Sequence, residues 1–325
     1  TLIGGLSGDA ITTGAQNTAV GTSALSASTT ASSNTAVGYQ AGYSNTTGSS
    51  NTAVGRKALL ANTTGHSNSA LGADLPGVVA GSALGANTTG LRNSAFGGSA
   101  LATNTTGSSN VAVGGAALHL NTTASNNTAV GYQAGYSNTT GQEITAVGRF
   151  ALNANTTGNN STATGVQSLQ SNTTGADNAS FGRLGLGANT TGSNNTSVGS
   201  AALRNNTTAG NNTAVGYQSL YDNTTGAQNT SVGFRSLYNN TTASNNAAFG
   251  QDALYSNTTG QYNVALGHST LVSNTTASNN TAVGYQSLYA NTTGTNNVAI
   301  GHEAGKAVTT GLENTIIGGA AGDAL

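Results

Sequence analysis

The chain has 325 residues, of which only eight are Lys or Arg and nine are Asp or Glu, whereas an average domain of this length carries roughly 80 charged residues. The few, scattered cations exclude nucleic-acid binding, which needs basic residues clustered against the phosphates. No apolar run of about 20 residues could span a membrane as a helix, and the absence of Cys excludes disulfides and sulfur-ligated metals.

A 17-residue period organises the chain. Its marker is a Gly that closes a tetrad like T-A-V-G, and it recurs at Gly4, Gly21, Gly38, Gly55 and Gly72 and, after one step of 25 residues, at Gly97, Gly114, Gly131, Gly148, Gly165, Gly182, Gly199, Gly216, Gly233, Gly250, Gly267, Gly284, Gly301 and Gly318. Units of this length are too short to fold alone, so they predict a solenoid in which each unit stacks on the next.

Written from its Asn, the unit reads N-T-A-V-G-x-x-A-L-x-x-N-T-T-G-x-x, and its columns predict where the core lies. Before the Gly, a small residue stands between Thr and a large apolar residue, as in Thr35, Ala36 and Val37. This alternation is typical of a strand with one face against a core. We expect Thr and Val to face that core. Leu four residues after the Gly, as at Leu59, predicts a second apolar column across the coil.

The N-T-T-G or N-T-T-A tetrapeptide, which occurs 15 times, predicts a turn in each unit. Asn tolerates the left-handed conformation, and the Gly is expected to supply a positive φ. Stacking would also align the Asn side chains into an amide ladder.

These columns predict an all-β fold, an elongated β-solenoid (parallel β-roll) of about nineteen rungs. Residues 1–72 and 81–325 are expected to be solenoid repeats of a single continuous fibre domain. Residues 73–80 (ADLPGVVA), which contain the only proline, Pro76, predict a bulge or kink. Because a 17-residue coil encloses little apolar area, we also expect lateral association, with three chains as one hypothesis.

The two ends of the sequence match each other. Residues 1–10 read TLIGGLSGDA and residues 315–324 read TIIGGAAGDA. This match indicates either one period of a longer repeat array or head-to-tail docking of chains in a filament. Two variant terminal repeats would explain it equally well.

The repeat resembles those of a known family. The run NTAVGYQAGYSNTTGSSNTAVG at residues 34–55, with relatives at 127–148 and 212–233, is similar to repeats of tail-fibre-domain proteins of phages and marine bacteria. The N-T-A-V-G core also resembles the N-S-V-A-I-G motif of trimeric autotransporter adhesin heads. That resemblance implies a parallel β-roll, association in trimers and a location outside the cell, on a cell surface or on a virion.

Residues capable of catalysis or metal binding are few and scattered. Of the four histidines, only His268 and His302 share a column, and they are two rungs, roughly 9–10 Å, apart. That separation is too long for one metal ion. The sequence therefore predicts no catalytic residue, no metal site and no cofactor.

Two sets of residues are candidate surface sites. Each Asn-Thr-Thr is a glycosylation sequon, although a turn preference explains the same letters; the Asn residues are Asn45, Asn62, Asn87, Asn104, Asn121, Asn138, Asn155, Asn172, Asn189, Asn206, Asn223, Asn240, Asn257, Asn274 and Asn291. Tyrosines that recur at two columns could stack on sugar rings or pack against neighbouring rods or across the coil; they are Tyr39, Tyr43, Tyr132, Tyr136, Tyr217, Tyr221, Tyr285 and Tyr289.

The sequence thus favours a non-catalytic structural or adhesive extracellular fibre that assembles with itself and could contact surface glycans. The alternative is an ice- or glycan-binding protein that acts through Thr, Asn or Tyr ladders. Ice binding favours T-x-T on one strand face, whereas the paired threonines here are adjacent and should point to opposite sides.

Overall fold

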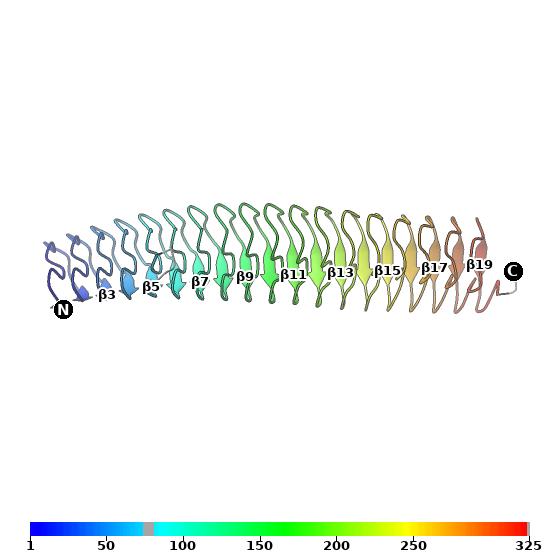
Figure 1. Cartoon of the computed structure of the whole chain (residues 1–325), viewed down its shortest axis with the longest axis horizontal. Coiled ribbons are helices and arrows are strands. Elements are labelled where there is room, and N and C mark those ends of the chain that lie inside the picture. Colours follow the sequence, from blue (N-terminus) through cyan, green and yellow to red (C-terminus); the bar gives the residue numbers. More distant parts are fainter. Residues whose placement is uncertain (74–80, 324–325) are drawn as a thin grey trace. The chain divides into compact units, whose positions relative to one another are not determined.

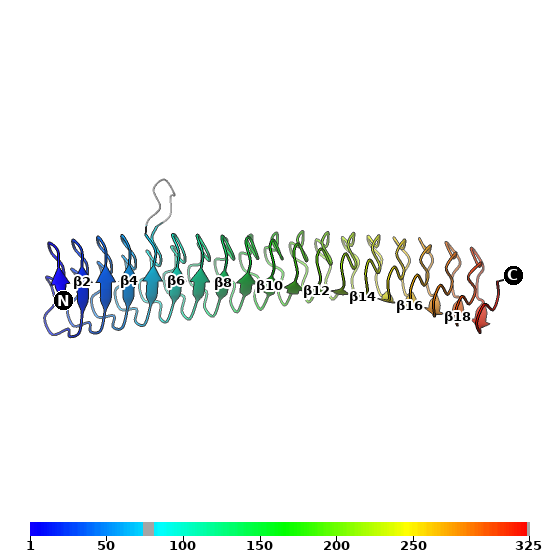
Figure 2. The ribbon, with the colours of Figure 1, turned by 90° about the horizontal axis from the view of Figure 1, so that it is seen from below.

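The computed structural model describes residues 1–73 and 81–323, and every regular element in them is a β-strand. The chain forms two compact units, residues 1–161 and 162–325. Each unit is a parallel β-solenoid with one short strand per turn, and in each the strands stack side by side (Figure 1, Figure 2). The predicted all-β solenoid fold is therefore confirmed.

The strands are three residues long except the first. In the first unit they are β1 (Leu2–Ile3), β2 (Thr18–Val20), β3 (Thr35–Val37), β4 (Thr52–Val54), β5 (Ser69–Leu71), β6 (Ser94–Phe96), β7 (Val111–Val113), β8 (Thr128–Val130) and β9 (Thr145–Val147). In the second they are β10 (Thr162–Thr164), β11 (Ala179–Phe181), β12 (Thr196–Val198), β13 (Thr213–Val215), β14 (Thr230–Val232), β15 (Ala247–Phe249), β16 (Val264–Leu266), β17 (Thr281–Val283), β18 (Val298–Ile300) and β19 (Thr315–Ile317).

Within each unit, consecutive strands pair in register, so that every residue lies beside its equivalent in the next turn. Thr196 pairs with Thr213, for example, and Val198 with Val215. The register holds across the 25-residue step, because Ala70 of β5 pairs with Ala95 of β6. The predicted bulge or kink at residues 73–80 lies outside the described residues except for Ala73.

The direction in which the strands face was predicted wrongly. The middle residue of the strands points inward, and Ala36 and Ala129 are fully buried. The flanking residues point outward, and Val198 and Phe181 are 39% and 45% exposed. The Val column is therefore an outer surface of the solenoid.

From β2 to β18 the middle residue of the strand is Ala or Ser, and only in the last strand, β19, is it a large residue, Ile316. The third residue after each repeat Gly crosses the coil and meets the middle residue of the next strand. Ser168 Oγ donates to Ser180 Oγ at 2.8 Å, and Ser219 Oγ to Ser231 Oγ at 2.7 Å. A Val in place of Ser180 or Ser231 would overlap this neighbour, which explains why Ala and Ser stand inside and Val outside.

The second predicted apolar column does form the core. Leu residues four positions after the repeat Gly, such as Leu118 and Leu220, are fully buried. They adopt φ values between 47° and 55°, a left-handed conformation that disfavours Leu by about 1–2 kcal/mol. This conformation explains why Gly42 and Gly135 replace Leu in some turns, where Leu25 and Leu118 of the preceding turn extend over the space.

We expect Leu220→Ala to lower the free energy of unfolding by about 2–5 kcal/mol, because it opens a cavity inside a narrow coil. Leu312, which is 60% exposed, provides a matched control, and Leu312→Ala should change stability by less than about 0.5 kcal/mol. Chemical denaturation followed by circular dichroism compares the two variants. Equal losses of stability would contradict the assignment of this column to the core.

The positive φ values are not where the turn tetrapeptide predicts them. Gly48 and Gly141 of N-T-T-G are absent from the residues with positive φ, so this part of the turn prediction was wrong. The repeat Gly does have a positive φ, 138° at Gly131. A Cβ there would lie 2.6 Å from the carbonyl oxygen of Gly148 in the next turn, so this column requires Gly.

Candidate functional site

The sequon asparagines form a ladder inside each solenoid, as predicted for the Asn column. Each of them is at most 1% exposed. Their Nδ2 atoms donate to the Asn Oδ1 of the preceding turn at 2.8–3.2 Å. They also donate to the carbonyl oxygen three residues ahead at 2.8–3.1 Å. The ladder ends at Asn291, since Val308 occupies the next position.

This geometry argues against sugars on these asparagines. A glycan is attached through Nδ2, the atom that makes both hydrogen bonds, and the buried column leaves no space for it. We therefore expect every peptide that contains Asn-Thr-Thr to have the mass of its sequence. Peptide-mass spectrometry of the protein from its natural source tests this, and additions of hexose-sized units at Asn-Thr-Thr would contradict it.

The two threonines of the turn have different environments. The first donates its hydroxyl to the carbonyl oxygen of its equivalent in the next turn, as from Thr190 Oγ1 to Thr207 O at 3.1 Å. The second, such as Thr191 or Thr259, is exposed. The first Thr therefore stabilises the stack, and the second belongs to the outer surface.

The outward residues of the strands form an apolar surface in each unit, which we call the T-A-V face: the first and third residues of each three-residue strand. The third residues are large and apolar in nearly every turn. Those that are 37–68% exposed are Val37, Leu71, Phe96, Val113, Val130, Phe181, Val198, Phe249, Leu266, Ile300 and Ile317. Such a contiguous exposed apolar stripe is unusual for a surface that contacts only water.

The predicted tyrosines lie on the outside in two columns, one and five residues after the repeat Gly, which we call the G+1 and G+5 columns. Six of the eight are 37–53% exposed, and Tyr136 and Tyr221 are half-buried. Four of them, Tyr136, Tyr217, Tyr221 and Tyr285, stack along the columns on aromatic rings of neighbouring turns. In the G+1 column Tyr217 stacks on Phe234, with ring centroids 5.5 Å apart, and Tyr285 lies between His268 and His302 at 5.5 and 5.2 Å.

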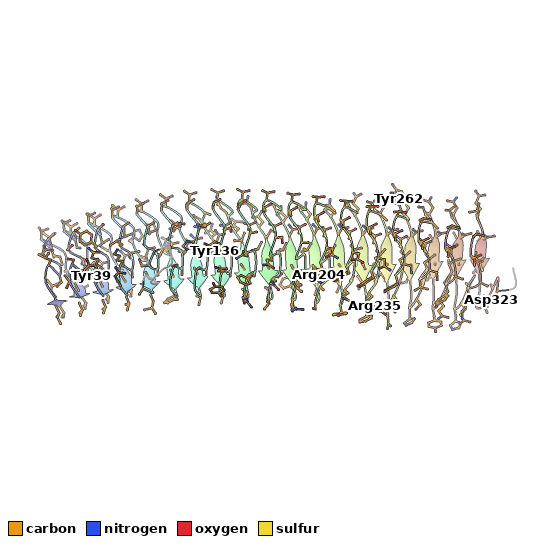
Figure 3. All side chains as sticks on the ribbon, in the orientation of Figure 1. Tyr39, Tyr136, Arg204, Arg235, Tyr262 and Asp323 are labelled. Carbon is orange, nitrogen blue, oxygen red and sulfur yellow. The ribbon has the colours of Figure 1, made fainter. Side chains whose placement is uncertain are left out.

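The G+5 column contains a ladder of three tyrosines. Tyr221, Tyr238 and Tyr255 stack with ring centroids 5.0 and 5.3 Å apart and interplanar angles of 2° and 16°. Arg204 Nη1 donates to the Tyr221 hydroxyl at 2.6 Å, and Arg235 lies over the Tyr255 ring at 5.2 Å. Figure 3 shows both arginines, which project from the second unit.

Burial in this ladder, together with the neighbouring Asp222 carboxylate, raises the pKa of the Tyr238 hydroxyl above its ordinary value. Tyr238 therefore stays a neutral phenol near pH 7.

Two members of this ladder were missed from the sequence. Tyr238 and Tyr255 were not among the candidate tyrosines, all of which belong to turns with a Tyr in both columns, whereas these two turns have Phe234 and Gln251 in the G+1 column. Alignment of every turn on its Gly would have placed both in the G+5 column. The histidines His268 and His302, which were too far apart to share a metal, are instead the two neighbours of Tyr285.

The G+5 ladder is interrupted after Tyr255. The next turn has Val272 in the column, and the turn after that has Tyr289. A hollow of about 250 Å³ lies at the interruption, lined by Arg235, Asp252, Tyr255, Ser269, Val272 and Tyr289. Arg235 Nε and Asp252 Oδ1 form an ion pair at 3.2 Å along one side of it.

The described residues contain no group of three or more His, Asp or Glu side chains placed to hold a metal ion. They also contain no helix with the length and hydropathy of a membrane span. No protein-family model, curated protein or solved structure matches the chain.

Proposed function

We propose that the chain is a non-catalytic structural protein of an extracellular fibre, in which copies associate side by side through the T-A-V face. The observation that carries the proposal is the orientation of the strands, which directs Val, Leu, Ile and Phe outward. A monomer gains nothing from this arrangement, since each exposed apolar side chain forgoes the free energy of burial. A second copy would bury the stripe.

The size of the face supports this association. Strands about 4.8 Å apart and three residues wide give each unit a face of roughly 400 Å². Pairing the face of one unit with the face of a second copy would therefore bury roughly 800 Å² in total, the size of a small interface. The T-A-V face carries no Lys, Arg, Asp or Glu, so no charge has to be desolvated.

A pair of double variants tests the proposal. We expect Phe181→Glu/Phe249→Glu to weaken self-association at least tenfold, because it places two charges in the interface. The control, Thr191→Glu/Thr259→Glu, introduces the same charges at the same spacing on exposed turn residues and should associate like the wild type. Sedimentation velocity measures association, and circular dichroism confirms that both variants keep the fold. Equal association of the two variants would refute the T-A-V interface.

The same face supports a second candidate function, the ordering of water at an ice surface. Thr and Val at alternate strand positions, as at Thr213 and Val215, place hydroxyl and methyl groups side by side in a regular array. The adjacent threonines of the N-T-T-G turn, which should point to opposite sides, argue against ice binding by the turn. They do not argue against ice binding by the T-x-V pattern of the strands. The two functions need the same surface, so a monomer with thermal hysteresis would favour ice binding over lateral assembly.

A further inference from the structure

We propose that the interruption of the G+5 ladder at Val272 is a binding slot for a single neutral pyranose ring whose substituents are equatorial, such as a β-glucoside. The inference goes beyond the proposed structural role and adds a ligand and its chemical class. The site lies wholly within the second unit.

The slot has the thickness of one ring. Where the ladder is complete, consecutive tyrosine rings stand 5.0 and 5.3 Å apart. Tyr255 and Tyr289 are two turns apart, with the shorter Val272 between them, and all three line the hollow. One inserted ring would therefore take the place of the missing tyrosine, at about 5 Å from each neighbour.

The size of the hollow also fits one ring. Its volume of about 250 Å³ lies below the range of roughly 300–1,000 Å³ that holds drug-sized ligands. A ligand of several fused or linked rings would extend beyond the slot into solvent, whereas a single hexose fits between the two tyrosines.

The lining combines apolar walls with polar groups at one side, which is what a sugar requires. A pyranose with equatorial hydroxyl groups presents C–H groups on both faces, so both faces can pack on aromatic rings. Its hydroxyls lie at the ring edge, where they can pair with hydrogen-bonding groups. The Arg235 side chain, 37% exposed, and the Ser269 hydroxyl can supply donors there, and Asp252 can supply an acceptor.

The charge of the site favours a neutral sugar. Arg235 and Asp252 compensate each other in an ion pair at 3.2 Å, and Gln251 Nε2 donates to Asp252 Oδ2 at 3.2 Å. No uncompensated cation is left in the slot to attract a uronate or a sulfated sugar. The tyrosine rings and the paired Arg235 and Asp252 side chains thus favour a neutral sugar over a charged one.

Filling the slot with the residue that its own column provides is the sharpest test. Val272→Tyr restores the side chain found at Tyr238 and Tyr255, so the fold should tolerate it while the slot closes. Val272→Ala is the matched control, because it keeps the slot open. Tyr289→Leu removes one wall and leaves the volume accessible.

Saturation-transfer NMR with methyl β-D-glucopyranoside measures binding to the full chain. We expect a dissociation constant on the order of 1 mM for this small ligand. Val272→Tyr should weaken binding at least tenfold and Tyr289→Leu at least fivefold, while Val272→Ala stays within about twofold. Unchanged binding by Val272→Tyr, or no binding by the wild type, would overturn the assignment. Binding of phenol at this slot with no binding of the glucoside would also overturn it, in favour of an aromatic ligand.

Binding of the glucoside should be independent of lateral assembly. The slot and the T-A-V face use different columns, so Phe181→Glu/Phe249→Glu should still bind the glucoside. Val272→Tyr should still associate with other copies. Loss of one property with retention of the other shows which of the two proposals fails.

Discussion

Gly131→Ala should destabilise the solenoid by about 3 kcal/mol or more. Gly131 has a φ of 138°, a conformation that L side chains rarely adopt. The added methyl group would lie 2.6 Å from the carbonyl oxygen of Gly148, which belongs to the backbone of the next turn and cannot move without disturbing the stack. Both effects act in the same direction, so the expected loss exceeds that of most single substitutions.

Gly141→Ala in the same turn is the control. A Cβ at Gly141 would be similarly crowded, at 2.5 Å from the carbonyl oxygen of Gly158, but its φ is not positive. Ala124, one turn earlier, fills the same position and is 1% exposed, so the stack can accommodate this methyl group. We expect a loss below about 1 kcal/mol, measured by urea denaturation. A loss as large as that of Gly131→Ala would mean that crowding, not backbone conformation, fixes the repeat Gly.

Asn223→Asp should have the second largest effect, a loss of about 3 kcal/mol at pH 7. Asn223 Nδ2 donates to Asn206 Oδ1 at 2.8 Å and to Gly226 O at 2.9 Å. A carboxylate would turn acceptors toward these two acceptors and bury a charge without a counterion. The shape of the side chain is unchanged, so the loss reports on the hydrogen bonds and the buried charge and not on packing.

The effect should depend on pH in a definite direction. Burial and the facing oxygens would raise the pKa of the new carboxyl group in the folded chain, so the variant binds a proton more readily when folded than when unfolded. Its deficit relative to the wild type should therefore shrink as the pH falls. Asn211→Asp, at an exposed position of the preceding turn, should change stability by less than about 0.5 kcal/mol. Equal effects of the two substitutions would contradict the buried ladder.

The sequence was sufficient to predict the architecture. A strict period of 17 residues, with an invariant Gly and recurrent Asn and Leu columns, allowed the fold class, the strand positions, the Leu core and the Asn ladder to be inferred. Each of these depends on one turn lying in register on the next, which the period itself specifies.

The orientation of the strand could not be inferred from its pattern, because T-A-V alternates equally well in either direction. Hydrophobicity favoured Val inside, whereas space favoured Ala. The deciding contact is between Ser168 and Ser180, 12 residues apart on facing sides of the coil, and no local pattern shows how narrow that coil is. Val and Phe are therefore exposed because the coil is too narrow for their side chains, although their hydrophobicity would favour burial.

The candidate surface residues were predicted in part. The exposed columns of Tyr217 and Tyr285 were found, but their partners Phe234 and His268 were not, because they are not tyrosines. The slot at Val272 exists because a Val stands where neighbouring turns have a Tyr. A Val in a repeat of this composition does not by itself indicate a binding site. The sequon Asn residues illustrate the opposite case, since a clear motif lies inside the core.

The mass of the wild-type chain in solution tests the proposed association most directly. If the T-A-V face of one copy covers that of another, as we propose, sedimentation equilibrium at micromolar concentration should give a multiple of 31.6 kDa. A single species of 31.6 kDa across the concentration range would contradict lateral assembly and leave the outward Val, Leu and Phe residues without a partner of the same kind.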